Sequence, residues 1–550
     1  MLKFENRKRA PLVPPISVSE LFVLSCVGHK DDVVINQNEV DFTRRQLLAD
    51  MKLLAKAFLQ LDVKAGDIMT VAFDRPLYDN VLVFLAANSI GAAVVFLDER
   101  VPFDTLVNYL AEFGSPLVVT YKAQPEEIDA LRQAAPGLKH VMNLDGGSDI
   151  QGFSVDGTPV VQIAARYTRR IPNNAFKADN LALVTFTSGS SSGPKAVAFT
   201  NRSLVAGAIY NKTASGVKMW DKRYHTWMQY VRFCYPYGFW VSTMSPILGG
   251  GKVYLTPDIS NQTLDYYLSK NPDTIFGVPA FIELLSKHLS ADVELTNLKM
   301  FASGGERLEV STAEKAMELF ERHGAREAVL CNGYGLAEVL GLVSTSVGQS
   351  YHPGTVGKVP AGVEVMVVDS ETGEELGFDE TGVICVHGTH MLKGYFNRPE
   401  VDAQKFFEAD GRRFLRTGDI GSIGRDGFVK LIGRSMFFIN NIPAKVYYEY
   451  VRGAVEQSQL VAASYVVSIP DKEYEFAACA FVVLKEGVAP NDEARRSILQ
   501  TASEPFWVGR DFIRLRPHEI PRRIVFLDAM PLTAAEKVDF RKLEQLAEEL

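Results

Sequence analysis

A run of hydroxyl-bearing and glycine residues ends in a lysine at residues 185–197, which read Thr-Phe-Thr-Ser-Gly-Ser-Ser-Ser-Gly-Pro-Lys-Ala-Val. The run directly follows the apolar stretch Leu181 to Val184. A buried strand that opens into a loop of small residues can turn its backbone N–H groups toward an anion. The serine hydroxyls add donors, and Lys195 adds a positive charge. The loop therefore predicts a polyphosphate-binding site and a nucleotide ligand.

The loop differs from the phosphate-binding loop of the Walker A type. That motif reads Gly-x-x-x-x-Gly-Lys-Ser/Thr, whereas Pro194 separates Gly193 from Lys195 here. Clusters of Ser and Gly also occur in flexible connectors, so the loop alone leaves a linker open. The strand before it and the Pro-Lys pair after it favour the binding loop.

Helical and extended patterns alternate around this loop. Apolar residues at Leu47, Met51, Leu54, Phe58 and Leu61 mark one face of a helix that ends before Gly66. The other expected elements of this part are helices around 78–90 and after 102, and strands at 68–73, 93–97, 117–120, 273–278, 298–303 and 328–332. Such alternation predicts doubly wound, mostly parallel sheets.

The C-terminal third has a different pattern. Residues 352–432 are rich in Gly and short extended runs, which predicts a β-barrel-like subdomain. Beyond it we expect strands near 463–469, 476–484 and 523–527, and helices near 444–456, 491–502 and 539–549. The sequence thus predicts an α/β fold with a large N-terminal core, residues 1–433, and a small α+β C-terminal domain, residues 434–550.

Composition excludes several classes of protein. With 550 residues, 47% hydrophobic and 23% charged, the chain is an ordinary globular protein of several domains. A net charge of -8 argues against a nucleic-acid surface. The five cysteines are far apart without a C-x-x-C pair, which favours reduced thiols. Without a secretory signal or a membrane span, we expect a cytoplasmic protein.

Six further segments follow the loop in order. They are Ser303-Gly-Gly-Glu306, Asn332-Gly-Tyr-Gly-Leu-Ala-Glu338, Gly394-Tyr-Phe-Asn-Arg-Pro399, Arg416-Thr-Gly-Asp419, Gly433-Arg434 and Pro531-Leu-Thr-Ala-Ala-Glu-Lys537. Together with the loop they resemble the core motifs of the adenylate-forming (ANL) superfamily, which includes acyl- and aryl-CoA ligases, adenylation domains of nonribosomal peptide synthetases, and luciferases. The resemblance covers about residues 40 to 545.

This resemblance implies ATP-dependent activation of a carboxylic acid. The carboxylate attacks the α-phosphate and pyrophosphate leaves, a reaction between anions that needs charge screening and alignment. In the family's pattern the loop holds the β- and γ-phosphates, Glu338 helps to bind Mg2+ during catalysis, Tyr334 stacks on adenine, and Asp419 binds the ribose. The candidate ATP-binding residues are Thr187, Ser188, Gly189, Ser190, Ser191, Ser192, Gly193, Lys195, Gly304, Gly305, Glu306, Asn332, Gly333, Tyr334, Gly335, Ala337, Asp419 and Arg434.

Lys537 is the candidate catalytic lysine. In the resembling family a lysine on a mobile C-terminal domain bridges the substrate carboxylate and the α-phosphate, where negative charge accumulates in the transition state. The segments Pro531-Leu-Thr before it and Val538-Asp-x-Arg541 after it match the family's pattern. A lone lysine would otherwise be read as a solvated surface charge.

Several positions depart from the family's pattern. Ser192 and Ala196 replace glycines, and Ala337 replaces a threonine whose hydroxyl reaches the α-phosphate. Loss of one such hydrogen bond costs about 1.5 to 3 kcal/mol, which adenylation should survive. In the hinge segment 435–443, Ile442-Pro443 stands where thioester-forming members have a glycine that admits the pantetheine arm. Glu536 replaces another glycine, directly before the lysine.

The acid pocket is expected between segments 232–240 and 332–340. Relatives that activate amino acids usually have an Asp in the first segment, and Phe233-Cys-Tyr-Pro-Tyr-Gly238 has none. Acyl- and aryl-CoA ligases often have a His there, for which Tyr235 is the nearest counterpart. The candidate pocket residues are Tyr235, Tyr237, Gly238, Phe239, Ser303 and Val339. Their aromatic surface favours an aryl or medium-sized apolar acid, although an aromatic stripe also suits a core.

Three functions stay open on the sequence. The first is transfer of the acyl group to a thiol, either coenzyme A or the phosphopantetheine of a separate carrier protein. The second is an amide ligase in which an amine captures the adenylate, and the altered hinge motivates it. The third is a non-catalytic protein that binds a nucleotide or an acyl-adenylate, although such a protein would not need Lys537. Luciferase-like oxidation has no specific residue in its favour.

Overall fold

The computed structural model describes residues 4–5, 10–145, 150–172, 178–187, 195–214, 225–306, 308, 310–346, 352–434, 438–440, 445–471, 475–508, 511–532 and 538–549. Within these ranges, none of the helices combines the length and the apolar character needed to cross a bilayer. All five cysteines are buried and none forms a disulfide, in agreement with the predicted reduced thiols.

The first large sheet has nine strands, and its five central strands are parallel to one another. In order across the sheet the strands are β20 (Gly394–Tyr395), β11 (Ala196–Thr200), β10 (Leu181–Phe186), β5 (Ala93–Phe96), β4 (Ile68–Val71), β6 (Leu117–Tyr121), β7 (His140–Leu144), β8 (Phe153–Val155) and β9 (Thr158–Pro159). Strands β4 and β5 are buried at every position, as expected for parallel strands covered on both faces. The loop singled out from the sequence connects β10 to β11.

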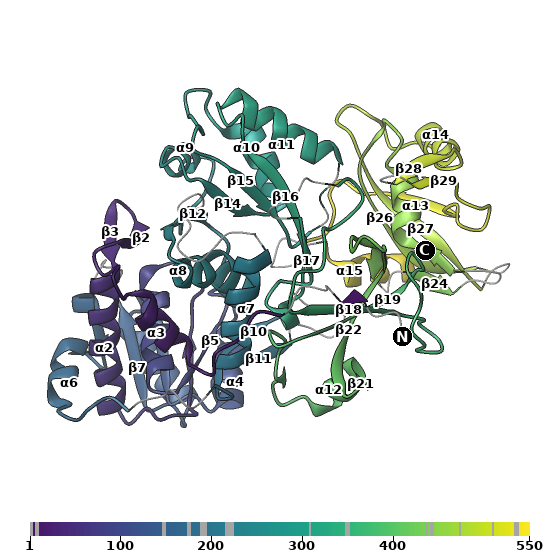
Figure 1. The fold of residues 1–550 in the computed structure, drawn as a ribbon. Coiled ribbons are helices and arrows are strands. Elements are labelled where there is room, and N and C mark those ends of the chain that lie inside the picture. The colour runs from purple at the N-terminus through teal and green to yellow at the C-terminus, as the bar shows by residue number, and fades with distance from the viewer. Residues whose placement is uncertain are drawn as a thin grey trace.

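The second large sheet has eight strands, six of them parallel. Its order is β17 (Ser344–Thr345), β16 (Val329–Tyr334), β15 (Met300–Ser303), β14 (Thr274–Gly277), β12 (Thr226–Gln229), β13 (Lys252–Leu255), β2 (Val33–Gln37) and β3 (Val40–Thr43). The order of the strands across the sheet differs from their order along the chain. Parallel neighbours cannot be joined by tight turns, so crossover connections that contain helices link them. Figure 1 shows β12, β14, β15 and β16 of this sheet in teal, and β2 and β3 in purple.

Helices fill the space around and between these sheets. They are α1 (Val18–Ser25), α2 (Arg44–Gln60), α3 (Tyr78–Ser89), α4 (Phe103–Phe113), α5 (Pro125–Ala134), α6 (Val160–Arg166), α7 (Asn201–Ala214), α8 (Ser245–Leu248), α9 (Leu264–Leu268), α10 (Pro279–His288) and α11 (Val310–Arg322). Helix α2 begins at a capping box, in which Thr43 and Gln46 exchange side-chain-to-backbone hydrogen bonds. Helix α3 is buried on nearly all sides, so it belongs to the core rather than to the surface.

Three short helical segments complete the N-terminal part. Two are 3-10 turns, η1 (Ile150–Gly152) and η3 (Ala337–Val339). The third, η2 (Tyr237–Met244), is a π-helix that continues directly into α8. π-Helical turns are rare in proteins, and those that occur are often found at functional sites.

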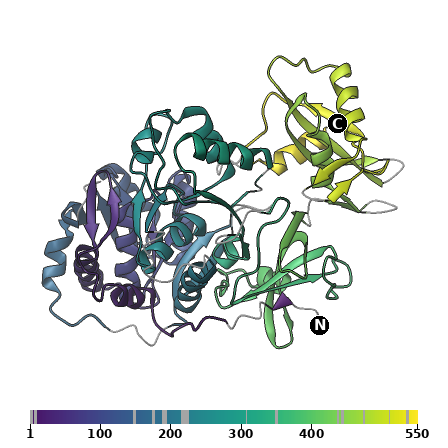
Figure 2. The same cartoon turned by 45° about the horizontal axis from the view of Figure 1, so that its top comes forward.

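The glycine-rich subdomain is an antiparallel sheet of six strands. Its path is β1 (Phe4–Glu5), β18 (Val363–Val368), β19 (Gly382–Gly388), β22 (Arg412–Ile423) and β21 (Phe406–Ala409), and β23 (Val429–Arg434) pairs with β22. Helix α12 (Pro399–Lys405) lies between β20 and β21 in the chain. The subdomain that we predicted to be β-barrel-like is this sheet, green in Figures 1 and 2.

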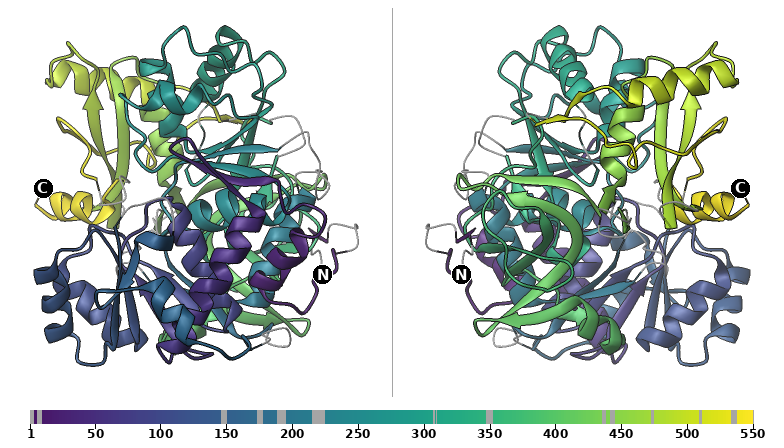
Figure 3. Two further views of the ribbon diagram at one scale, coloured as in Figure 1. Left: turned by 90° about the vertical axis from the view of Figure 1, so that its left-hand side faces the viewer. Right: turned by 90° about the vertical axis from the view of Figure 1, so that its right-hand side faces the viewer.

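The C-terminal domain is small and mixed. Its main sheet contains β26 (Val461–Asp471), β27 (Glu475–Leu484) and β30 (Arg523–Phe526), and two hairpins add β24 (Phe438–Asn440), β25 (Lys445–Tyr447), β28 (Phe506–Val508) and β29 (Asp511–Ile513). Its helices are α13 (Tyr448–Val455), α14 (Asp492–Ala502) and α15 (Phe540–Glu548). Figures 2 and 3 show this yellow-green domain as a separate body beside the teal sheet. The predicted fold class is confirmed.

Candidate active site

One cavity of about 510 Å³ lies where several predicted segments meet. The carboxyl ends of β14, β15 and β16 form one wall, and η2 with the neighbouring ends of α7 and α8 forms another. Thr187 and Lys195, at the two ends of the loop between β10 and β11, also line it. Ligands of open α/β sheets bind outside the carboxyl ends of the parallel strands, so the fold places a binding site here.

Two hydrogen bonds join the two ends of the predicted phosphate-binding loop. The backbone N–H of Thr187 donates to the carbonyl of Lys195 at 3.0 Å. The backbone N–H of Lys195 donates to Thr187 Oγ1 at the same distance. The intervening loop residues, including the candidates Ser188, Gly189, Ser190, Ser191, Ser192 and Gly193, lie outside the described residues. The geometry therefore fixes where the loop starts and ends, beside the cavity.

The predicted adenine and ribose residues come together from two sheets. Tyr334, the last residue of β16, donates from its hydroxyl to Asp419 Oδ2 at 2.6 Å, and both residues are buried. In the antiparallel pairing of β22 with β23, Arg434 is directly opposite Asp419. Three candidates that are as much as 100 residues apart in the chain are thus neighbours at one place in the fold.

Glycines stand at several of the predicted nucleotide-binding positions, and at two of them the backbone geometry favours glycine. A Cβ on Gly335 would lie 2.1 Å from the backbone of Gly341, so only glycine fits there. A Cβ on Gly304 would touch the Tyr237 ring at 3.4 Å, and Gly305 has a φ of +81°. The candidates that line the cavity on this side are Gly304, Gly305, Glu306, Asn332, Gly333, Gly335 and Ala337.

Glu338 brings a carboxylate to the cavity from the turn η3. Its Oε1 accepts a hydrogen bond of 2.7 Å from the hydroxyl of Tyr395 in β20. Burial and the neighbouring Glu338 raise the pKa of Tyr395, so the phenol keeps its proton and stays a donor. The sequence did not single out Tyr395 as a site residue, although Tyr395 belongs to the family-like segment Gly394 to Pro399.

The other side of the cavity is aromatic. The hydroxyl of Tyr237 lies 3.0 Å from the carbonyl of Gly277 and 3.1 Å from that of Ala302, to which it donates at the ends of β14 and β15. Trp227 stacks on Phe276, with ring centroids 5.2 Å apart and planes within 7°. Tyr235 and these three aromatic residues all line the cavity. A flat, apolar wall of this kind fits an aromatic or apolar group.

The six candidates for the acid pocket do not all belong to it. Tyr235, Tyr237 and Ser303 line the cavity. Phe239 and Val339 are fully buried in hydrophobic clusters, and Phe239 packs on Phe84 at 4.9 Å. A Cβ on Gly238 would lie 2.3 Å from the carbonyl of Arg232, so this glycine permits a close backbone approach. Gly238 and Phe239 lie behind the wall because the winding of η2 directs neighbouring residues to different sides. Val339, in η3, lies behind it because its side chain packs into a hydrophobic cluster.

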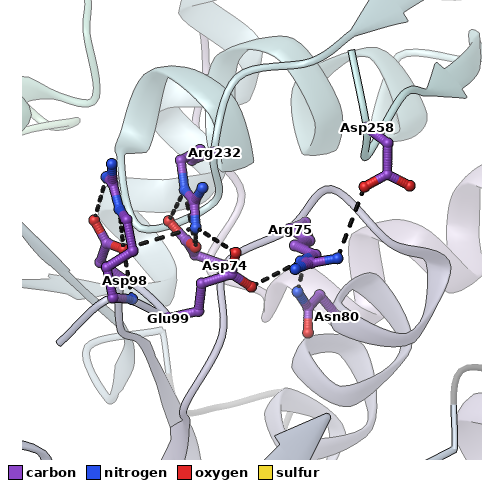
Figure 4. A network of polar contacts seen from close by, with 8 residues as sticks. Asp74, Arg75, Asn80, Asp98, Glu99, Arg232 and Asp258 are labelled. Carbon is purple, nitrogen blue, oxygen red and sulfur yellow. Dashed lines mark hydrogen bonds and ion pairs between the residues drawn. The ribbon is translucent and has the colours of Figure 1, made fainter. Parts of the chain in front are cut away.

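A network of charged residues surrounds Arg232 (Figure 4), and its carboxylates Asp74 and Asp98 act on Tyr235. Arg232 Nε donates to Asp74 Oδ2 at 2.8 Å, and its Nη2 is 3.2 Å from Glu99 Oε1 and 3.7 Å from Asp98 Oδ1. Although burial alone would lower it, the pKa of Arg232 is raised by the hydrogen bond and charge of Asp74. The network joins the segments after β4, β5 and β12, and thus ties the two large sheets together at the cavity.

The same network accounts for a group of side chains with metal-binding character. Asp74, Asp98 and Cys234 bring potential ligand atoms within 4.8 Å of one another. The guanidinium of Arg232 already lies against both carboxylates, so the positive charge that they need is supplied by the protein. Glu338 suits a hard divalent ion better, because it offers a carboxylate at the wall of the cavity, and Mg2+ prefers oxygen ligands.

Lys537 lies outside the described residues. The segment 533–537 begins and ends at one β-bridge between Leu532 and Val538, and Asp539 N–H donates to the carbonyl of Pro531 at 2.8 Å. Of the hinge segment, 438–440 forms β24, and Ile442-Pro443 lies outside the described residues. The roles assigned to these residues remain predictions.

Two family models match separate parts of the chain. Residues 23–396 match the model of the AMP-binding enzyme family, and residues 453–537 match that of the AMP-binding enzyme C-terminal domain. The first match alone spans more than half of the chain. The chain belongs to the AMP-binding enzyme family. It is therefore an adenylate-forming ligase, as the resemblance of its motifs implied.

Individual members of the family are only distantly similar in sequence. Tyrocidine synthase 1 of Brevibacillus parabrevis is 21% identical over 555 residues, which are 99% of this chain and 46% of that protein. D-alanine--D-alanyl carrier protein ligase of Streptococcus pneumoniae is 25% identical over 524 residues, or 92% of this chain and 93% of that protein. The amide bond synthetase McbA from Marinactinospora thermotolerans superposes with a TM-score of 0.77 at 21% identity and covers 96% and 99% of the two chains.

Proposed function

We propose that this AMP-binding enzyme activates an aryl or medium-sized apolar carboxylic acid. The acid and ATP form an acyl-adenylate, and pyrophosphate is released. One observation carries the proposal: a single cavity joins the base of the phosphate-binding loop to an aromatic wall that contains Tyr237 and Trp227. Both reactants of such a reaction can therefore bind in contact with each other.

The carboxylates of the cavity argue against an amino acid as the substrate. Among the described residues that line it, only Glu306 and Glu338 are acidic, and both belong to the nucleotide side. Asp74 and Asp98 lie near Tyr235 but are engaged by Arg232 and Arg100. No lining carboxylate is left at the aromatic side for an α-ammonium group, which would be costly to bury without a partner.

The roles of the candidates combine the family's pattern with the contacts of those residues that the structure describes. Asp419, held by Tyr334, accepts hydrogen bonds from the ribose hydroxyls. Glu338 would hold Mg2+, and the ion would supply positive charge that screens the phosphates. Lys537 stabilises the charge that develops between the carboxylate and the α-phosphate.

The second step transfers the acyl group to a thiol of coenzyme A or of a carrier protein. The thiol sulfur attacks the acyl carbon, AMP leaves, and the thiol proton is released. An amide ligase is the second candidate, because Ile442-Pro443 replaces a glycine in the hinge. An amide bond synthetase of the same fold shows that the architecture admits this chemistry elsewhere.

ATP–pyrophosphate exchange tests the first step without knowledge of the acceptor. Aryl, fatty and amino acids are compared at equal concentration, and we expect exchange with aryl or apolar acids and none with amino acids. If a folded protein that binds ATP exchanged pyrophosphate with no acid in a broad panel, the protein would be a non-catalytic nucleotide-binding member of the family. Product analysis with coenzyme A, or with amines, then separates the two acceptors.

A further inference from the structure

A polar cluster lines the cavity where α7 ends and α8 begins. It consists of Asn211, Lys212 and Ser245. Helix α8 continues directly from η2, which carries Tyr237, so the cluster belongs to the acid side of the cavity and not to the nucleotide side. No sequence motif pointed to these residues, and the proposed function has not used them.

Asn211 in α7 and Ser245 in α8 both point toward the cavity, as the spacing of residues along each helix shows. Gly207, Asn211 and Ala214 share one face of α7, and a Cβ on Gly207 would meet Trp240 Nε1 of η2 at 3.0 Å. This face of α7 therefore packs on the η2–α8 segment. Ser245 follows Val241 by four residues, and both line the cavity. Two polar side chains thus project into the junction of these helices beside an apolar wall.

Among the residues that the structure describes, neither polar group has a hydrogen-bond partner. Asn211 Nδ2 and Ser245 Oγ are both buried and unpaired, and Ser245 is only 8% exposed. A buried donor without a partner is costly, so native proteins rarely keep one without a reason. Lys212 adds a cation at the same place, with its side-chain carbons beside Gly249. The cluster offers N–H, O–H and ammonium donors and has no carboxylate among them.

We infer that this cluster recognises an oxygen substituent on the acid, at a position remote from the carboxylate that reacts. The substrate is then an aryl acid that carries a hydroxyl or another hydrogen-bond-accepting oxygen, rather than a wholly apolar acid. This inference rests on the proposed function, because it assumes that the acid occupies the aromatic side of the cavity. The aromatic wall binds the ring, and Asn211 and Ser245 determine the specificity for the substituent.

The test compares matched acids in ATP–pyrophosphate exchange. The probes are 3- and 4-hydroxybenzoate and 4-hydroxycinnamate, each paired with the acid in which a methyl group replaces the hydroxyl. We expect kcat/KM to favour at least one hydroxylated acid over its methyl partner by about tenfold or more, the value of one good hydrogen bond. The preference should fall toward unity in Asn211→Leu and in Ser245→Ala.

Thr213→Ala is the matched control, since Thr213 is on the same helix, is exposed, and bonds only to the carbonyl of Ile209. It should keep the preference of the wild type. Because the readout is a ratio between two acids, a general loss of activity does not imitate the effect. Equal exchange of every pair by the wild type, or an unchanged preference in both cluster variants, would overturn the inference while leaving the adenylation intact. Absence of exchange with all acids would overturn the proposed function and the inference with it.

Discussion

The ion pair between Asp74 and Arg232 permits a quantitative test of how the cavity is held in shape. The side chain of Asp74 is 0% exposed and that of Arg232 is 31% exposed. Replacing the arginine by methionine keeps most of the side-chain volume but removes the guanidinium that contacts Asp74, Asp98 and Glu99. Glu99 and Asp98 would then keep their ion pairs with Arg75 and Arg100, whereas Asp74 would lose the guanidinium that pairs with it.

The expected cost follows from the burial of the two groups. Removal of one partner of a buried ion pair costs about 3 to 5 kcal/mol, because an uncompensated charge stays behind. Arg232 is partly exposed, so water can approach Asp74 in the variant, and we expect the lower limit, about 3 kcal/mol. A second substitution, Asp74→Asn, removes the stranded charge and should restore more than about 1 kcal/mol.

Urea unfolding followed by tryptophan fluorescence measures this cost, since Trp227 and Trp240 report on the N-terminal part. The control is Arg45→Met, because Arg45 also makes a two-pronged contact with an aspartate, Asp31, but with side chains 59% and 82% exposed. Its loss should stay below about 1 kcal/mol. If Arg232→Met cost no more than Arg45→Met at an unchanged m-value, the buried network would not hold the two sheets together.

Acidification tests the same network from the carboxylate side. Burial alone would raise the pKa of Asp98 and of Glu99, but hydrogen bonds from Arg100 and Arg75 and the charge of Arg232 lower both. A lowered pKa in the folded state contributes stability that is present above the unfolded value, near pH 4, and is lost as the pH falls through the folded value. The Arg232→Met variant should therefore lose less stability on acidification than the wild type does.

Three other variants test single residues. Lys537→Ala should abolish ATP–pyrophosphate exchange but leave ATP binding, measured by calorimetry, and near-normal exchange would remove its catalytic role. Tyr334→Phe deprives Asp419 of its 2.6 Å hydrogen bond and should raise the KM for ATP about tenfold, corresponding to about 1.5 kcal/mol for a bond to a charged group, with the KM for the acid unchanged. An equal rise in both constants would contradict a role in nucleotide binding. Burial lowers the pKa of His390 to about 4, so its neutral form stabilises the fold fully above pH 6.5, and this contribution is lost as the pH falls toward 4. In thermal unfolding between these pH values His390→Gln should flatten the profile, and the exposed His288→Gln should leave it unchanged.

The elements that hold the site were predictable from local patterns. Fully apolar runs such as β5 and the regularly spaced apolar residues of α2 indicate burial directly, and short-range periodicity defines a helix or a strand. The glycine and hydroxyl-bearing residues of the loop likewise predicted an anion-binding segment from their types alone. What could not be predicted was long-range pairing: Arg232 meets Asp74 across 158 residues, and the segment around each reads as an ordinary polar turn.

The acid side of the cavity shows why residue type alone was insufficient. Tyr237 and Phe239 belong to one aromatic run, yet the first borders the cavity and the second packs in the core. The sequence did not predict the π-helical winding of η2, and this winding determines which of the two side chains borders the cavity. Asn211 and Ser245 are not aromatic and belong to no family motif. Only the contact of α7 with α8 brings both of them to the cavity. The family's motifs thus point to the nucleotide chemistry, whereas the residues on the aromatic side of the cavity are brought together by helix packing that those motifs do not contain.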